Sequence, residues 1–135
     1  MENYIVKDEI VIFSPKFNKE IELELFEKYS NVIFSNFELN EDIFECYEKN
    51  NFNNFEYKCN NFNRKVNLQP NLTHLTFGHH FNQQVNLPPN LTYLTFGCCF
   101  NQQVNLPPNL THLTFGSLFN QQVNLPPNLT HLTFN

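Results

Sequence analysis

A 19-residue repeat fills the second half of the chain and constrains its fold more than any other feature. The segment Phe81 to Thr92 recurs almost unchanged from Phe100 and again from Phe119, and a variant of it begins at Phe62. A unit this short cannot bury its own apolar side chains, so stacked copies must share one core. The period therefore predicts a solenoid.

Each unit contains one segment with the pattern of a strand. Leu75-Thr76-Phe77 alternates apolar, polar and apolar residues, as a half-buried strand does. The return between Phe81 and Leu91 contains Pro88-Pro89, which lacks amide donors and excludes a regular helix. We expect a tight bend at Gly78, where glycine would supply backbone freedom. The equivalent bend glycines are Gly97 and Gly116.

The apolar positions of each unit are expected to face inward. In one unit they are Leu72, Leu75, Phe77, Phe81, Val85 and Leu87. Burying a large apolar side chain contributes roughly 1.5–3 kcal/mol, whereas ordering the backbone costs roughly 1–2 kcal/mol per residue, so only the whole array is stable. The sequence predicts an all-β, short-coil, leucine-rich-repeat-like solenoid. Each turn of about 19–23 residues should hold one short strand and an extended or polyproline-like return, with little or no helix.

The N-terminal half carries a looser version of the same spacing. If Val11, Val32 and Phe55 are equivalents of the central strand leucine Leu75, the steps between them stay close to the period of the later repeats. We interpret residues 1–61 as diverged N-terminal repeats that act as a cap. Residues 62–135 are then four near-identical repeats of the same continuous domain.

Charge is confined to the first half of the chain. All 13 acidic and 8 basic residues lie at or before Lys65, and the formal net charge is −5, so a nucleic-acid partner is not expected. No signal peptide is visible and no apolar stretch approaches the roughly 20 residues of a membrane span, so a membrane partner is not expected either. The four cysteines form no dense framework, which favours an intracellular, reducing location.

The consensus Phe-Asn-x-x-Val-x-Leu-Pro-x-Asn-Leu-Thr-x-Leu-Thr-Phe-Gly resembles the FNIP repeat. This leucine-rich-repeat-like unit is found in social amoebae and in large DNA viruses that infect amoebae. The resemblance is specific over 62–135 and loose over 11–61, and Gln-Gln or Arg64-Lys65 replaces the name-giving Ile-Pro. It implies a curved β-solenoid with a protein-interaction role, no catalytic residues and, for a viral protein, a location in the host cytoplasm.

The same resemblance offers a second function. Some relatives carry an F-box ahead of the repeats, which would imply an adaptor that delivers a target to ubiquitin ligase machinery. Here the segment 1–61 is better interpreted as diverged repeats. No nucleophile–base pair or phosphate-binding loop is visible, so we expect no enzyme activity and no cofactor.

One register position should form an exposed column on the strand face. Its side chains would lie beside a row of threonines and offer a protein partner hydrogen bonds and aromatic area. Two neighbouring histidines in this column could share a metal ion, although exposed polar positions of a duplicated unit are the simpler interpretation. The candidate partner-binding face is His74, Thr76, Tyr93, Thr95, His112, Thr114, His131 and Thr133.

Histidine and cysteine gather at the bend. His79-His80, Cys98-Cys99 and Ser117-Leu118 share one register, and mixed His and Cys ligands suit zinc. Adjacent residues of an extended segment point to opposite sides, so four convergent ligands are not expected and we assign no metal site. A metal-binding protein is therefore the least favoured function.

Two further features concern the ends of each coil and of the stack. Asn82 and its repeats at 101 and 120 are expected to satisfy backbone groups at the bend. The last unit stops at Phe134-Asn135 without a polar capping segment, which predicts an open apolar edge and a possible homodimer through it. The expected function is a non-enzymatic scaffold for protein–protein interaction.

Overall fold

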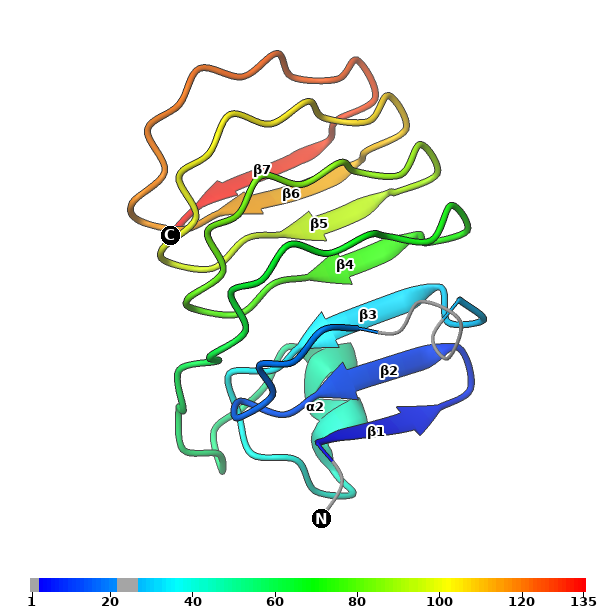
Figure 1. The fold of residues 1–135 in the computed structure, drawn as a ribbon, viewed down its shortest axis with the longest axis vertical. Helices are drawn as coiled ribbons and strands as arrows, with labels where there is room; N and C mark the ends of the chain where they lie inside the picture. The colour runs from blue at the N-terminus through cyan, green and yellow to red at the C-terminus, as the bar shows by residue number, and fades with distance from the viewer. Residues whose placement is uncertain (1–2, 22–26) are drawn as a thin grey trace.

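The computed structural model describes residues 3–21 and 27–135, which form a stack of coils with one short strand in most turns (Figure 1). The described residues contain one sheet of seven strands in sequence order and one helix. The elements are β1 (Tyr4–Lys7), β2 (Ile10–Phe13), β3 (Asn31–Phe34), α2 (Ile43–Lys49), β4 (His74–Thr76), β5 (Tyr93–Thr95), β6 (His112–Phe115) and β7 (His131–Phe134). The predicted all-β, leucine-rich-repeat-like solenoid is confirmed.

The constant period of the repeats sets the register of the last four strands. β4 to β7 pair in parallel, and the strand leucines lie opposite one another in a row. Val32 of β3 and Val11 of β2 continue this row, also in parallel pairing. The predicted row is Leu75, Leu94, Leu113 and Leu132, and it is confirmed.

The N-terminal segment departs from the predicted succession of three turns. β3 pairs directly with β4, with Val32 opposite Leu75, so the prediction that Phe55 belongs to the row is wrong. β1 runs antiparallel to β2 and covers its free edge, and Asp8 turns the hairpin at a φ of 54°. The N-terminal end of the sheet is therefore closed by a hairpin.

The interior of the stack is built on two columns of parallel phenylalanine rings. Phe77 and Phe96 have ring centroids 5.7 Å apart in neighbouring coils, and Phe81 and Phe100 have centroids 6.1 Å apart. Within one coil the rings of Phe77 and Phe81 stack at 3.7 Å. All four side chains are at most 2% exposed. Aromatic stacking adds to the free energy gained from apolar burial.

The predicted inward positions all contact the core, although burial is less complete along the return. Leu72 and Leu75 are at most 1% exposed, as predicted. Val85 and Leu87 are only partly buried. Pro88 is buried instead, and its carbonyl accepts the amide of Leu91 in a turn that closes the corner of the coil. The return therefore contributes both its aliphatic residues and the buried proline of its corner to the packing of the coil.

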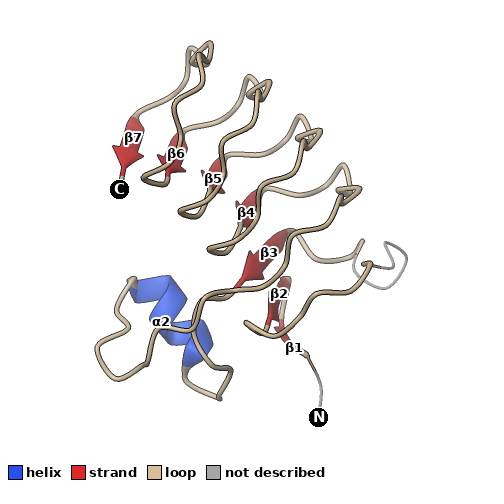
Figure 2. Cartoon of the chain, turned by 60° about the vertical axis from the view of Figure 1, so that its left-hand side comes forward, coloured by secondary structure: helices blue, strands red, loops and turns tan. Residues whose placement is uncertain are grey.

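A second, smaller core lies on the outward face of the sheet. Ile12 and Ile33 point away from the phenylalanine columns and are covered by Ile43 of α2, and all three are buried. Figure 2 shows α2 on the side of the sheet opposite to the returns. Phe52 and Phe55 pack into this outer core, which explains why their spacing does not form a strand of the row.

The helix is tied to the coil that follows β3. The Tyr47 hydroxyl donates to Ser35 Oγ at 2.8 Å, and Ser35 Oγ donates to the Phe37 carbonyl at 2.8 Å. Burial raises the pKa of Tyr47 to about 12, although the hydrogen bond with Ser35 opposes that rise. The helix is thus fixed over β2 and β3 by both apolar packing and a partly buried hydroxyl pair.

The bend glycines are required for close approach of the coils. No described glycine has a positive φ, so the expected need for backbone freedom is wrong. A Cβ atom on Gly97 would lie 2.2 Å from the carbonyl oxygen of Gly78, and one on Gly116 would lie 2.2 Å from that of Gly97. Glycine therefore allows adjacent bends to touch.

The repeated asparagine forms a ladder between coils, as predicted. The backbone N–H of Asn101 donates to Asn82 Oδ1 at 2.9 Å, and the backbone N–H of Asn120 donates to Asn101 Oδ1 at 3.0 Å. The same side-chain oxygens also accept from glutamine, with Gln102 Nε2 at 3.0 Å from Asn82 Oδ1. Backbone groups that a proline-containing return leaves without a sheet partner are satisfied in this way.

Candidate functional site: the outward strand face

Four aligned rings form a column on the outward face of β4 to β7. His74 and Tyr93 stack with ring centroids 4.5 Å apart, Tyr93 and His112 at 4.1 Å, and His112 and His131 at 4.1 Å. Their planes differ by no more than 11°. The rings match the register of the strands, which places residues of one repeat position directly opposite each other.

A threonine ladder fixes the histidine rings of this column. Thr73 Oγ1 donates to the carbonyl of Ser30 at 3.1 Å, and Thr111 Oγ1 donates to the carbonyl of Thr92 at the same distance. A hydroxyl has one proton, so each oxygen can only accept from the adjacent Nδ1, which lies 2.8 Å away in His74. The hydrogen therefore sits on Nδ1, and Nε2 is left as a hydrogen-bond acceptor. Thr130 and His131 repeat the arrangement at 2.8 Å.

Two histidines of the column, His74 and His112, are shifted toward the neutral form. Burial lowers the pKa of His74, and the nearby His112 lowers it further. Burial likewise lowers the pKa of His112, with His131 as the second cause. Protonating one ring places a positive charge beside another imidazole, which disfavours the second protonation. At neutral pH the lowered pKa values favour uncharged rings at His74 and His112.

The second predicted row of the face lies beside the rings. Thr76, Thr95, Thr114 and Thr133 occupy the register position that Ile12 and Ile33 occupy in β2 and β3. The outward face thus changes from apolar and covered by α2 to polar and open at the step from β3 to β4. All eight predicted face residues lie in the two expected rows.

A groove opens where the covered part of the face meets the open part. Its volume is about 520 Å³, and its walls come from both halves of the chain. Phe44 and Tyr47 of α2 form one side, and Thr76 and Tyr93 form the other. Lys7, Asp8 and Glu48 add charged groups of the kind that the chain lacks from Val66 to Asn135. The sequence did not reveal the helical wall, because the Ile43, Phe44 and Tyr47 spacing lies in a segment interpreted as a strand-bearing repeat.

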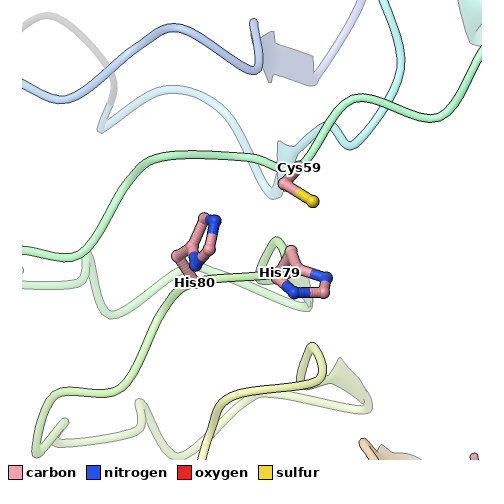
Figure 3. Close-up of side chains that lie close together, drawn as sticks. All are labelled: Cys59, His79 and His80. Carbon is pink, nitrogen blue, oxygen red and sulfur yellow. The ribbon is translucent and has the colours of Figure 1, made fainter.

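The bend brings together more metal-ligating groups than the sequence predicted. Ligand atoms of Cys59, His79 and His80 lie within 4.8 Å of one another, and so do those of His79, Cys98 and Cys99. Figure 3 shows Cys59 facing the bend that carries the two histidines. The prediction that adjacent residues diverge is wrong here, because these pairs lie in turns. The strand-face histidines form no such group of three within the described ranges.

The comparisons with known proteins place the repeats in a family. The FNIP Repeat family model matches residues 62–99 and 100–135, which together exceed half of the chain. A search of the curated proteins finds no match. In the described part of the chain no helix is long and apolar enough to cross a membrane.

Among solved structures, the chain is similar to CroV588, which is described as a novel circular LRR protein. The sequence identity is 24% and the TM-score is 0.41. The similarity covers 98% of this chain and 31% of that chain, so this chain spans less than a third of that protein's length. On the match of the repeat model over 62–99 and 100–135, the chain belongs to the FNIP repeat family.

Proposed function

We propose that this protein is an interaction scaffold that binds a protein partner on the outward face of β4 to β7. The repeat family and the leucine-rich-repeat-like fold fit such a role. The observation that carries the proposal is the change along the outward face. α2 covers it over β2 and β3, whereas over β4 to β7 it presents aligned rings with no covering element in the described residues.

The chemistry of the face defines the partner that fits it. The histidine Nε2 atoms accept hydrogen bonds, the threonine hydroxyls donate or accept them, and Tyr93 is 42% exposed. No charged residue lies between Val66 and Asn135, so long-range electrostatic steering contributes little to binding. A partner with donor groups and a flat apolar or aromatic surface matches these rows.

The groove beside α2 gives the face a defined end. A partner side chain that enters it would contact Tyr93 on one wall and Phe44 on the other. Lys7 and Glu48 at its edge would select for a partner with complementary charges there. The energetic centre of the interface is therefore expected at β4 and β5, with β6 and β7 as the extension.

The proposal is tested by partner capture with two matched variants. Tyr93→Ala/His112→Ala removes the centre of the ring column, and Asn86→Ala/Asn105→Ala changes exposed positions on the return face. Quantitative mass spectrometry should find proteins that the wild type and the return-face variant retain equally and that the strand-face variant loses. Equal retention by both variants, with unchanged circular dichroism, would contradict the choice of face. Ligase subunits among the retained proteins would point to the adaptor function.

A further inference from the structure

We propose that His79, Cys98 and Cys99 form a binding site for one zinc-class metal ion that joins two neighbouring coils. The site lies on the bend edge of the solenoid, away from the ring column of the strand face. It is independent of partner binding there. The three residues come from the bends that follow β4 and β5.

The geometry already brings the ligand atoms together. One nitrogen of His79 and the two sulfur atoms lie within 4.8 Å of one another, so short side-chain rotations could bring all three onto one ion. Zn–S and Zn–N bonds of about 2.3 Å and 2.0–2.1 Å place ligand atoms of one ion at similar mutual separations. The cysteines are free thiols in intermediate burial, so the sulfurs are neither oxidised to a disulfide nor packed away from solvent.

Two hydrogen bonds fix the position of His79. Its Nδ1 lies 2.8 Å from the Tyr57 hydroxyl, which leaves Nε2 as the nitrogen not engaged by tyrosine. Its backbone amide donates to Asn36 Oδ1 at 2.9 Å. Metal binding through Nε2 requires the hydrogen on Nδ1, which then donates to the Tyr57 oxygen. A hydrogen bond of this kind fixes the tautomer and direction of a metal-binding imidazole.

The donor set determines the class of metal. Two thiolates neutralise the charge of a divalent ion, and imidazole with thiolate is a ligand combination that zinc accepts in tetrahedral geometry. Three protein ligands leave a fourth position for water. Magnesium and calcium prefer oxygen ligands, so they are not expected to bind here.

The neighbouring group of Cys59, His79 and His80 is the weaker alternative. It also uses His79, but it offers one thiol in place of two, and both Cys59 and His80 are exposed. The next coil carries Ser117 and Leu118 at the same register, and Ser117 Oγ lies 3.2 Å from Cys98 Sγ. Side chains that can bind zinc therefore occupy two successive bends and stop at the third, although the rest of the unit is nearly unchanged.

The experiment titrates cobalt(II) alone, as a spectroscopic substitute for zinc, into metal-free full-length protein under a non-thiol reductant. We expect one cobalt per chain, a thiolate-to-cobalt charge-transfer absorption, and complete displacement by zinc. Cys98→Ser/Cys99→Ser should abolish the absorption, and His79→Gln should weaken binding at least tenfold. Because the ion joins two coils, zinc should also raise the melting temperature of the wild type but not that of the cysteine variant.

Two control variants separate this site from others. Cys59→Ser and Cys46→Ser should both leave the absorption and the stoichiometry unchanged. Absence of a thiolate band in the folded wild type would overturn the proposal. Loss of the band in Cys59→Ser with retention in Cys98→Ser/Cys99→Ser would overturn it in favour of the other group. Circular dichroism of each metal-free variant shows whether it is folded, and the single variants Cys98→Ser and Cys99→Ser replace the double variant if that one is not.

Discussion

The ring of Tyr93 lies nearly parallel to the ring of His112, with the centroids 4.1 Å apart and the planes 10° from each other. Both residues occupy the same position of successive repeats, and their strands are in register at this pair. A duplicated unit thus converts one outward residue into a continuous ring surface. The order of the rings in that surface is set by the pairing of the strands, which does not depend on the partner.

This stack should be measurable as a coupling in the free chain. Cross-strand aromatic pairs contribute roughly 0.2–1 kcal/mol, so Tyr93→Ala and His112→Ala should each lower the free energy of unfolding modestly. Their double variant should cost less than the sum of the single variants by about 0.5 kcal/mol. Urea unfolding of all four proteins tests this, and strictly additive effects would show that the rings are in contact without stabilising each other.

The histidine column should make stability depend on pH. The pKa values of His74 and His112 lie below the ordinary 6.5, so the unfolded chain binds more protons than the folded chain in the window below that value. The free energy of unfolding should therefore fall as the pH drops from about 7 to about 5. The rings are partly exposed, so the loss should be under about 1 kcal/mol.

The pH effect has a matched control in glutamine, which is neutral at every pH. His74→Gln/His112→Gln should flatten this part of the profile, because it removes the two rings whose pKa values burial lowers. The charged groups that face His74 across the groove are Lys7, Asp8 and Glu48. An unchanged slope in the glutamine variant would contradict the assignment of the pH dependence to His74 and His112.

The phenylalanine columns should differ sharply between the middle and the end of the stack. Phe96 is 2% exposed and stacks between Phe77 and Phe115, whereas Phe134 is 61% exposed. Phe96→Ala should cost about 3–5 kcal/mol, as buried Phe→Ala changes do, and Phe134→Ala should cost well under half of that. Similar losses for the two variants, measured by chemical denaturation, would contradict the assigned interior.

The bend should tolerate no side chain where two coils touch. Gly97→Ala places a methyl group 2.2 Å from the Gly78 carbonyl oxygen, so the backbone must shift to admit it. We expect a loss of about 1–3 kcal/mol. The exposed Gln84→Ala serves as the control and should change stability by less than about 0.5 kcal/mol. A neutral Gly97→Ala would mean that the bends are not in contact.

The free edge of β7 should drive association of the chain. Leu132 and Phe134 are 39% and 61% exposed, and β7 pairs with β6 on one side only within the described residues. We propose self-association through this edge, which offers both unpaired backbone groups and apolar area. Sedimentation should show a concentration-dependent dimer that Leu132→Lys/Phe134→Lys disperses, and a monomer at millimolar concentration would refute the proposal.

The repeats could be predicted from the sequence because a constant period fixes which residues of neighbouring strands pair with each other. A constant step from one repeat to the next puts Leu75, Leu94 and Leu113 opposite one another, and the ring column follows from that. The residues around Phe52 and Phe55 could not be placed in the same way. Their spacing matches a strand, yet aromatic side chains satisfy the same pattern when they pack on an outer face beneath a helix.

The sequence predicted the strand face more completely than the cluster at the bend or the groove. Outward positions of a strand follow directly from alternation, so all eight face residues were predicted. The convergence at the bend depends on turn geometry, because adjacent side chains such as Cys98 and Cys99 diverge in extended backbone and can converge in a turn. The groove could not be predicted, because α2 forms one of its walls and the repeat pattern does not indicate a helix there.

Histidine labelling of the complex tests the central claim most directly. Diethylpyrocarbonate modifies accessible neutral imidazoles, and the chain carries histidines on both the strand face and the bend. With a captured partner bound to metal-free protein, the labelling rates of His112 and His131 should fall severalfold, while that of the exposed His80 should stay unchanged. Protection of His80 with undiminished labelling of His112 and His131 would contradict the assignment of the outward strand face as the binding surface.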